Sequence, residues 1–198
     1  DAGIALKRLS DLCDTLSLEY AEASTVDRSS LIGLVKNKNV SISIPETIDG
    51  KQVSEIDLCA FYRDDFSSVS LPSSLRKIDR AAFLRCDKLN SVTFSEGITT
   101  IEKNAFRHCE VLSQMTLPTS LTTLGTHSFD GTNIAEISFV GLGITELPEG
   151  VFSNCEKLEK VEGLAQIQKI GDSAFDGCVR LSEVQFSLQL REIGVGAF

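Results

Sequence analysis

Four recurring cysteines are the first residues that could do chemistry, because thiols form disulfides and thiolates bind metals. Cys86, Cys109, Cys155 and Cys178 occupy one position of a repeat, where Thr132 stands once instead. Stacked repeats would bring neighbouring cysteines within bonding range, so a bridge stays open beside buried free thiols. We interpret them as buried free thiols. No C-x-x-C pair occurs, so the sequence does not support a metal site.

The two histidines are the remaining candidates for acid–base or metal chemistry. His108 and His127 stand on different parts of adjacent repeats, so we interpret them as surface residues on turns, with a shared metal or an acid–base pair as the alternatives. Gly141-Leu-Gly143 resembles half of a dinucleotide fingerprint, but no βαβ unit surrounds it, so we expect a loop that absorbs an extra residue. No nucleophile, base and oxyanion donor converge, so we predict no catalytic residue, no cofactor and no enzyme.

The composition is that of an ordinary globular protein. The 198 residues are 42% hydrophobic and 24% charged, with 14 Gly and 4 Pro. With 19 Lys and Arg against 28 Asp and Glu, the net charge is −9, which disfavours a nucleic-acid partner. No apolar run approaches the roughly 18 residues that a spanning helix needs, so we predict no membrane span.

A regular spacing of phenylalanines shows which elements must position these residues. An aliphatic residue stands five places before each of them and another stands eight places before. This period indicates a solenoid, in which one coil of about 23 residues cannot bury its apolar side chains alone and must stack on the next. The anchors, which we expect to form one internal spine, are Phe61, Phe83, Phe106, Phe129, Phe152, Phe175 and Phe198.

The repeated unit carries a resemblance to a known family. Leu75 to Ile78, Ala82-Phe83, Cys86, Leu89 and Val92 fit the pattern L-x-x-I-x-x-x-A-F-x-x-C-x-x-L-x-x-V. The chain therefore resembles the BspA-like, treponemal-type leucine-rich repeat over about residues 40–198. The resemblance implies an α/β-type solenoid of about seven coils, a right-handed superhelix with a parallel β-sheet on its concave wall. It also implies a secreted, cell-surface or periplasmic protein that binds other macromolecules.

The N-terminal segment lies outside the repeat. Its apolar residues recur at three- and four-residue steps over residues 3–22, which predicts an amphipathic helix that caps the first coil. We therefore expect two parts, a helical cap and linker over residues 1–38 and the repeat domain over residues 39–198. The residues of the stripe are Leu9, Leu12, Cys13, Leu16 and Tyr20.

The strand positions that face away from the core are the candidates for binding. In each L-x-x-V-x-L strand, the residues flanking the central apolar one point outward. These columns are rich in Ser and Thr in the first coils and become larger and charged in the later ones. A solvated face without a partner stays open, because the columns contain no Trp, Tyr or Arg. The candidate binding residues are Gln114, Glu136, Lys160, Glu162, Glu183 and Gln185.

The last coil has no capping element in the sequence. Its apolar residues Leu190, Ile193, Val195 and Phe198 would be left uncovered. An uncovered coil has an open strand edge that invites pairing. We therefore expect that the protein continues or that it self-associates through this end.

Two functions follow as hypotheses. The first is a non-enzymatic interaction module at the cell surface, secreted or in the periplasm, which binds an unidentified protein partner in adhesion to host or envelope macromolecules. The alternative is a cytoplasmic scaffold subunit that organises a larger complex, because free thiols suit a reducing compartment.

Overall fold

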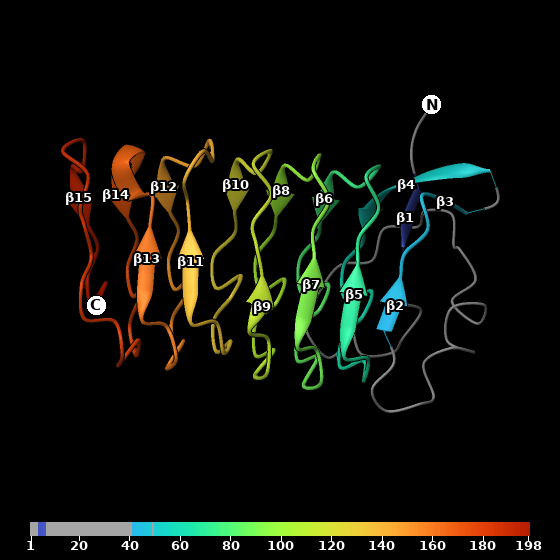
Figure 1. Ribbon diagram of the computed structural model, residues 1–198, viewed down its shortest axis with the longest axis horizontal. Helices are drawn as coiled ribbons and strands as arrows, with labels where there is room; N and C mark the ends of the chain where they lie inside the picture. Colours follow the sequence, from blue (N-terminus) through green and yellow to red (C-terminus); the bar gives the residue numbers. More distant parts are fainter. Residues whose placement is uncertain (1–3, 7–40, 49) are drawn as a thin grey trace.

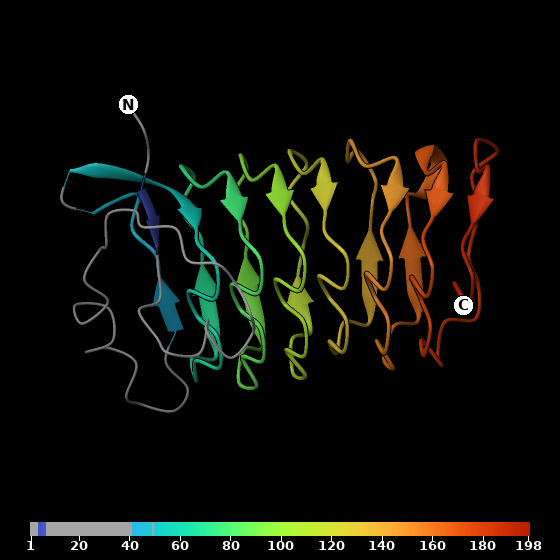
Figure 2. The same ribbon diagram turned by 180° about the vertical axis from the view of Figure 1, so that it is seen from behind.

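The fold is a stack of about seven coils, seen from the two sides in Figures 1 and 2. The computed structural model describes residues 4–6, 41–48 and 50–198. Each complete coil contributes one strand to a front wall and one to a back wall, and then a turn around its phenylalanine. The predicted solenoid is thus confirmed, as a β-solenoid with parallel sheets.

The front wall is made of short strands in which one apolar residue points inward between two polar ones. In Ser91–Thr93, for example, Val92 is buried between Ser91 and Thr93. The ladder is parallel and in register, with Ser68 opposite Ser91 and Val69 opposite Val92. The strands are β2 (Ser41–Ser43), β5 (Ser68–Ser70), β7 (Ser91–Thr93), β9 (Gln114–Met115), β11 (Glu136–Ser138) and β13 (Lys160–Glu162).

The back wall is formed by the segment that precedes each phenylalanine. Its aliphatic residue points inward, as Ile78 and Ile101 do, and the polar residue before it faces outward. These strands are β4 (Lys51–Ile56), β6 (Lys77–Ile78), β8 (Thr100–Ile101), β10 (Thr123–Leu124), β12 (Glu146–Leu147), β14 (Lys169–Ile170) and β15 (Glu192–Ile193).

The expected α/β character is wrong for the described residues. They contain no α-helix, and their one helical element is the 3-10 turn η1 (Leu164–Gln166). The physical reason lies in the turn around each phenylalanine, where the residues two before and two after it have positive φ, a left-handed conformation that interrupts an α-helix.

The turn around each phenylalanine links neighbouring coils by backbone hydrogen bonds that lie outside the strands. Asn104, Phe106 and His108 each donate a backbone N–H to the next coil, and the Phe106 bond to the Ser128 carbonyl measures 2.8 Å. The residues two before and two after each anchor adopt the left-handed conformation. In described coils these residues have φ between 51° and 76°, and most of them are not glycine.

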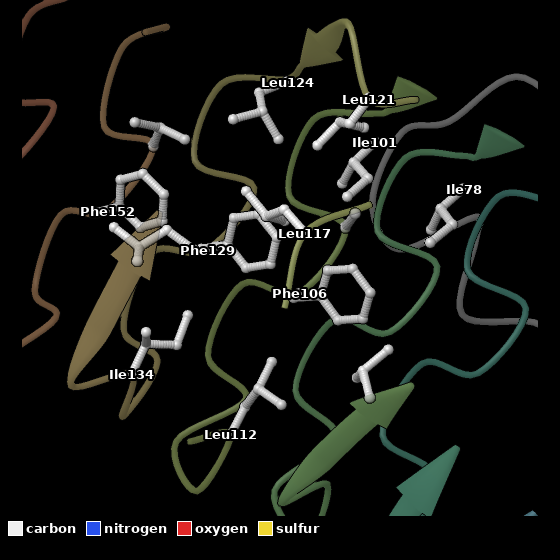
Figure 3. Close-up of a cluster of buried hydrophobic side chains, with 14 of the residues drawn as sticks. Ile78, Ile101, Phe106, Leu112, Leu117, Leu121, Leu124, Phe129, Ile134 and Phe152 are labelled. Carbon is white, nitrogen blue, oxygen red and sulfur yellow. The ribbon is translucent and has the colours of Figure 1, made fainter. Parts of the chain in front are cut away.

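The phenylalanine rings form a continuous stack inside these turns. Adjacent rings from Phe61 to Phe198 have centroids 4.9–5.8 Å apart and planes within 3–15° of parallel. Figure 3 shows Phe106, Phe129 and Phe152 in a row, with aliphatic residues on both sides. Rings at such offsets contribute stacking in addition to the hydrophobic area they bury.

Both walls are interrupted at the same boundary. β9 pairs with β7 but not with β11, and β10 pairs with β8 but not with β12. The coil that begins with β11 carries its extra residue in a turn at Val140 and Gly141, where the coils of β5 and β9 have Pro72-Ser-Ser74 and Pro118-Thr-Ser120. The Phe129 turn continues across this boundary, because the Phe129 N–H donates to the Val151 carbonyl at 3.0 Å.

The N-terminal part departs from the helical cap that the sequence predicts. Ile4–Leu6 form strand β1, which pairs in parallel with β4, so the helix prediction is wrong for these three residues. The other residues of the predicted cap and linker lie outside the described residues. A second addition to the first coil is β3 (Thr47–Ile48), which pairs antiparallel with β4.

Candidate functional site

The candidate binding residues lie side by side on the front wall. Glu136 is opposite Lys160, and Ser138 is opposite Glu162, in the paired strands β11 and β13. An isolated parallel bridge then joins Lys160 to Glu183 in the last coil. All six candidate side chains are exposed, and their inward neighbours Ile137 and Val161 belong to the core. Whether these six residues bind a partner stays a prediction.

Lys160 is the one cation of this surface and it faces several carboxylates. Its Nζ lies 2.5 Å from Glu162 Oε1. The hydrogen bond to Glu162, and then the negative charges of Glu162 and Glu136, raise the pKa of Lys160. Because Glu136, Glu162 and Glu183 surround this single lysine, the surface keeps an excess of negative charge. It is therefore electrostatically suited to a basic partner.

A cleft opens on the front wall where β9 and β11 do not pair. Its volume is about 220 Å³, and it is lined by Met115, Thr116, Leu117, Glu136, Ile137, Ser138 and Glu162. Leu117 and Ile137 belong to the buried core, and Glu136 and Glu162 are exposed. The cleft thus combines an apolar floor with an acidic rim. Sequence reasoning predicted the irregular coil but not this cleft.

The back wall carries a second charged column that sequence reasoning missed. Lys77 Nζ lies 2.7 Å from Glu55 Oε1, and Lys169 Nζ lies 2.8 Å from Glu192 Oε1. The signal was present, because every back strand places its polar residue directly before the inward aliphatic one. Here each lysine is bonded to a neighbouring carboxylate, and the middle of the wall is neutral with Thr100 and Thr123.

The two histidines lie on separate turns, each against a glycine of the next coil. A Cβ built on Gly131 would lie 2.7 Å from His108 Nδ1, and one on Gly150 would lie 2.2 Å from the His127 ring. Glycine at these places therefore makes room for the rings. His127 Nδ1 lies 3.5 Å from the buried Asp130 carboxylate. The two rings thus pack against different glycines, one in each of two neighbouring turns.

Asp130 is a buried carboxylate that is held by the turns on both sides of it. Arg107 Nε lies 2.9 Å from Asp130 Oδ2 and Asn154 Nδ2 donates to Oδ1 at 2.9 Å. A buried carboxylate is tolerated when it is paired and hydrogen-bonded in this way. We assign these contacts to the docking of three consecutive turns.

The cysteine ladder has a structural role in the turns. Cys86 Sγ donates to the Phe61 carbonyl at 2.9 Å, and Cys109 Sγ to the Phe83 carbonyl at 3.1 Å. Cys155 and Cys178 make the same bond to the preceding coil, and all four are buried free thiols. Burial raises the pKa of Cys155 to about 11 and that of Cys178 to about 12. Such thiols are poor nucleophiles.

Carboxylate clamps join two pairs of coils at the other end of the front strands. Glu46 accepts hydrogen bonds from the Ser73 N–H at 2.7 Å and the Ser74 N–H at 2.9 Å. These bonds, led by the Ser73 N–H, lower the pKa of Glu46 to about 2. Glu96 binds Thr119 and Ser120 in the same way. The corresponding residues after β11 are Gly141 and Leu142, which offer no hydroxyl to a clamp.

The residues predicted for self-association lie on the last coil. Ile193, Val195 and Phe198 are 51%, 82% and 52% exposed, and Leu190 is half-buried. Phe186 and Leu188 of the same coil are exposed as well. Self-association through this end stays a prediction.

Two further observations concern membranes and metals. Among the described residues, no helix has the length and apolar character needed to span a membrane. Over the same part of the chain, no three His, Cys, Asp or Glu side chains are arranged to hold a metal ion.

The comparisons with known proteins agree with this geometry. Residues 36–159 and 145–198 match the BspA type leucine rich repeat region, in 6 copies. No curated protein gives a significant match. A leucine rich repeat protein of T. pallidum is 27% identical with a TM-score of 0.56, and the alignment covers 74% of this chain and 80% of that one.

Two other solved structures share the fold at lower identity. A leucine-rich repeat protein from Bacteroides ovatus is 24% identical with a TM-score of 0.61, covering 78% of this chain and 48% of that one. A leucine rich cell surface protein from Faecalibacterium prausnitzii is 24% identical with a TM-score of 0.68, covering 82% and 45%. The chain thus spans less than half the length of these two. The repeat, the solenoid and the family match together show that this chain belongs to the BspA type leucine-rich repeat family.

Proposed function

We propose that the chain is a non-enzymatic interaction module that binds a protein partner through the charged half of its front wall. The observation that carries this proposal is the excess of carboxylates around Lys160 on an exposed surface, next to a cleft with an apolar floor. On the back wall Lys169 likewise faces Glu146, Glu192 and Asp172, so what distinguishes the front wall is the cleft that Glu136 and Glu162 line. Complementary charge steers association and selects partners. Leucine-rich repeats are typically interaction modules rather than enzymes, which supports the proposal.

The experiment compares two matched sets of substitutions. In the front-wall variant, Glu136, Lys160, Glu162 and Glu183 are all changed to Ala. In the control, Glu55, Glu146, Lys169 and Glu192 of the back wall are changed in the same way, so that both variants lose three carboxylates and one lysine. Circular dichroism during urea unfolding first verifies that both variants fold.

The immobilised chain and both variants are then incubated with extract of the source cells or of the host. Bound proteins are quantified by mass spectrometry. The proposal expects a protein that is retained by the wild type and by the back-wall variant and is lost from the front-wall variant. Equal retention on all three chains, or loss from the back-wall variant alone, would contradict it.

The proposed location is the cell surface, the periplasm or the medium, with adhesion to host or envelope macromolecules as the role. The family resemblance is what supports this location. Protease treatment of intact source cells, followed by detection of the chain with an antibody, tests it. Digestion without lysis supports an exposed location.

A cytoplasmic scaffold subunit is the second candidate, and the buried thiols favour it. Four free cysteines in consecutive and near-consecutive coils are unusual where disulfides form readily. Recovery of the chain in the cytoplasmic fraction and not in the periplasmic one, together with co-purification in a large complex, would support this candidate instead.

A further inference from the structure

The cleft between β9 and β11 is a consequence of the irregular coil. That coil has one residue fewer before β11 and one more after it, in the turn where the Leu142 N–H donates to the Phe139 carbonyl at 3.1 Å. β11 therefore follows the register of β13 and does not pair with β9. Figure 1 shows the wider separation of these two strands compared with β7 and β9.

The edge of β9 that faces the cleft offers main-chain donors and acceptors. The Gln114 N–H points toward β7, where it donates to the Asn90 carbonyl at 3.1 Å. Because successive residues of a strand alternate, the Met115 N–H points the other way, toward β11. The two strands share no backbone hydrogen bond in the described part of the chain. A peptide that enters the cleft can therefore bond to the main chain as well as to side chains.

The size and lining of the cleft fit a single side chain. Its volume of about 220 Å³ is below the roughly 300 Å³ at which small-molecule pockets begin. Met115, Leu117 and Ile137 give it an apolar floor, whereas Glu136 and Glu162 stand at its rim. Lysine and arginine side chains have this same distribution, an apolar stem with a cationic head.

The negative charge of the rim determines which charge a ligand in the cleft should carry. Lys160 is bonded to Glu162 and also lies beside Glu136 and Glu183. Glu136 is therefore a rim carboxylate that shares its neighbouring cation with two other glutamates. An anion would be repelled here, and a neutral apolar side chain would leave the carboxylates desolvated without a partner. A charge-assisted hydrogen bond from a cationic head group is favourable at this place.

We propose that this cleft receives a lysine or arginine side chain of the protein partner, with the stem on Met115 and Ile137 and the head at Glu136. The inference rests on the proposed function, because it identifies the chemistry of the partner on the front wall. It adds a defined contact point to the charged surface.

The test uses a capped pentapeptide with a central lysine among glycines as the probe, titrated into the ¹⁵N-labelled chain and followed by NMR. We expect shift changes centred on the amides of Met115, Thr116 and Ser138. The same peptide with Nε-acetyl-lysine keeps the stem and loses the charge, and it should bind at least fivefold more weakly. Raising the salt concentration should weaken the lysine peptide and not the acetylated one.

Two substitutions of exposed residues locate the contact. Glu136→Gln should weaken the lysine peptide at least threefold, whereas Glu192→Gln on the back wall, which removes the same charge, should leave it unchanged. Equal binding of both peptides, shift changes elsewhere, or an unaffected Glu136→Gln variant would overturn the inference.

The outcome separates this inference from the proposed function. If the peptide does not bind the cleft but the front-wall variant loses its protein partner, only the cleft inference fails. If the peptide binds the cleft but the front-wall variant retains every captured protein, the cleft is a cation-binding site and the proposed function fails.

Discussion

Replacing Phe106 by Ala removes one ring from the middle of the phenylalanine stack. The Phe106 side chain is fully buried, with its centroid 4.9 Å from that of Phe83 and 5.3 Å from that of Phe129. Phe94 adds an edge contact at 5.9 Å. Alanine would lose contacts with three rings at once and would leave a cavity that the stacked coils cannot close by themselves.

The magnitude follows from the buried area. A phenylalanine buries roughly 200 Å², and at about 25 cal/mol per Å² this gives an upper value of about 5 kcal/mol. Measured substitutions of buried Phe by Ala cost about 3–5 kcal/mol. Phe186 of the last coil is 51% exposed, so the same substitution there should cost about half as much, roughly 1.5–2.5 kcal/mol.

The assay is urea unfolding followed by circular dichroism, with Phe186→Ala as the control that changes the same atoms. Phe106→Leu keeps most of the volume and loses the stacking, so it should fall between the two. We would abandon the interpretation of the stack as the structural spine if Phe106→Ala cost no more than Phe186→Ala.

Three other predictions concern the clamp, the thiols and the last coil. Because the folded pKa of Glu46 is about 2 against the usual 4.5, its clamp stabilises the fold above pH 4.5 and is lost as the pH falls toward 2. Glu46→Gln should therefore be less stable than wild type in urea unfolding at pH 7, with the difference gone at pH 2; a constant difference would count against the clamp. With its pKa at about 11, Cys155 has a thiolate fraction of about 0.1% at pH 8, so iodoacetamide should label it at least a hundredfold more slowly in the folded chain than in urea. Rapid labelling in the folded chain, measured by mass spectrometry, would show that the turn opens. If the last coil self-associates, sedimentation velocity should show dimers that Val195→Lys abolishes, and a concentration-independent monomer would exclude this.

The periodic features of the fold could be predicted from the sequence because the same positions of the repeat are buried in each coil. Every anchor position must be apolar for the coils to stack, so Phe83 and Phe106 show the spine directly in their spacing. The cysteine ladder follows for the same reason. The loop at Gly141 was also predicted, since one extra residue must leave the repeat somewhere.

Other features have no signal in residue type. Apart from β4, the back-wall strands are two residues long, too short for an alternating pattern to identify. Left-handed conformations at Ala81 and Arg85 are set by hydrogen bonds to the neighbouring coils, and these residue types do not predict them. At the N-terminus, Ile4–Leu6 satisfy a helical pattern equally well, but pairing with the free edge of β4 determines their structure.

The candidate site likewise has one part that the sequence predicts and one part that it does not. The outward columns of the front wall follow from strand alternation, and the structure exposes Glu136 and Glu183 as that alternation requires. The cleft depends on whether an irregular coil keeps pairing with its neighbour. That outcome is decided by the register of β11 on β13, which is a tertiary property.

The shared interruption of both walls has a mechanical consequence. Stretching the chain along the solenoid axis loads every boundary between coils in series, so the boundary with the fewest bonds opens first. Between β9 and β11 the load is borne by the phenylalanine turns and by the bond from the Asn133 N–H to the Leu112 carbonyl, because neither sheet crosses there. Under tension the molecule should therefore extend in two stages, separating into an N-terminal block that ends at Phe129 and a C-terminal block that begins at β11 before either block unravels.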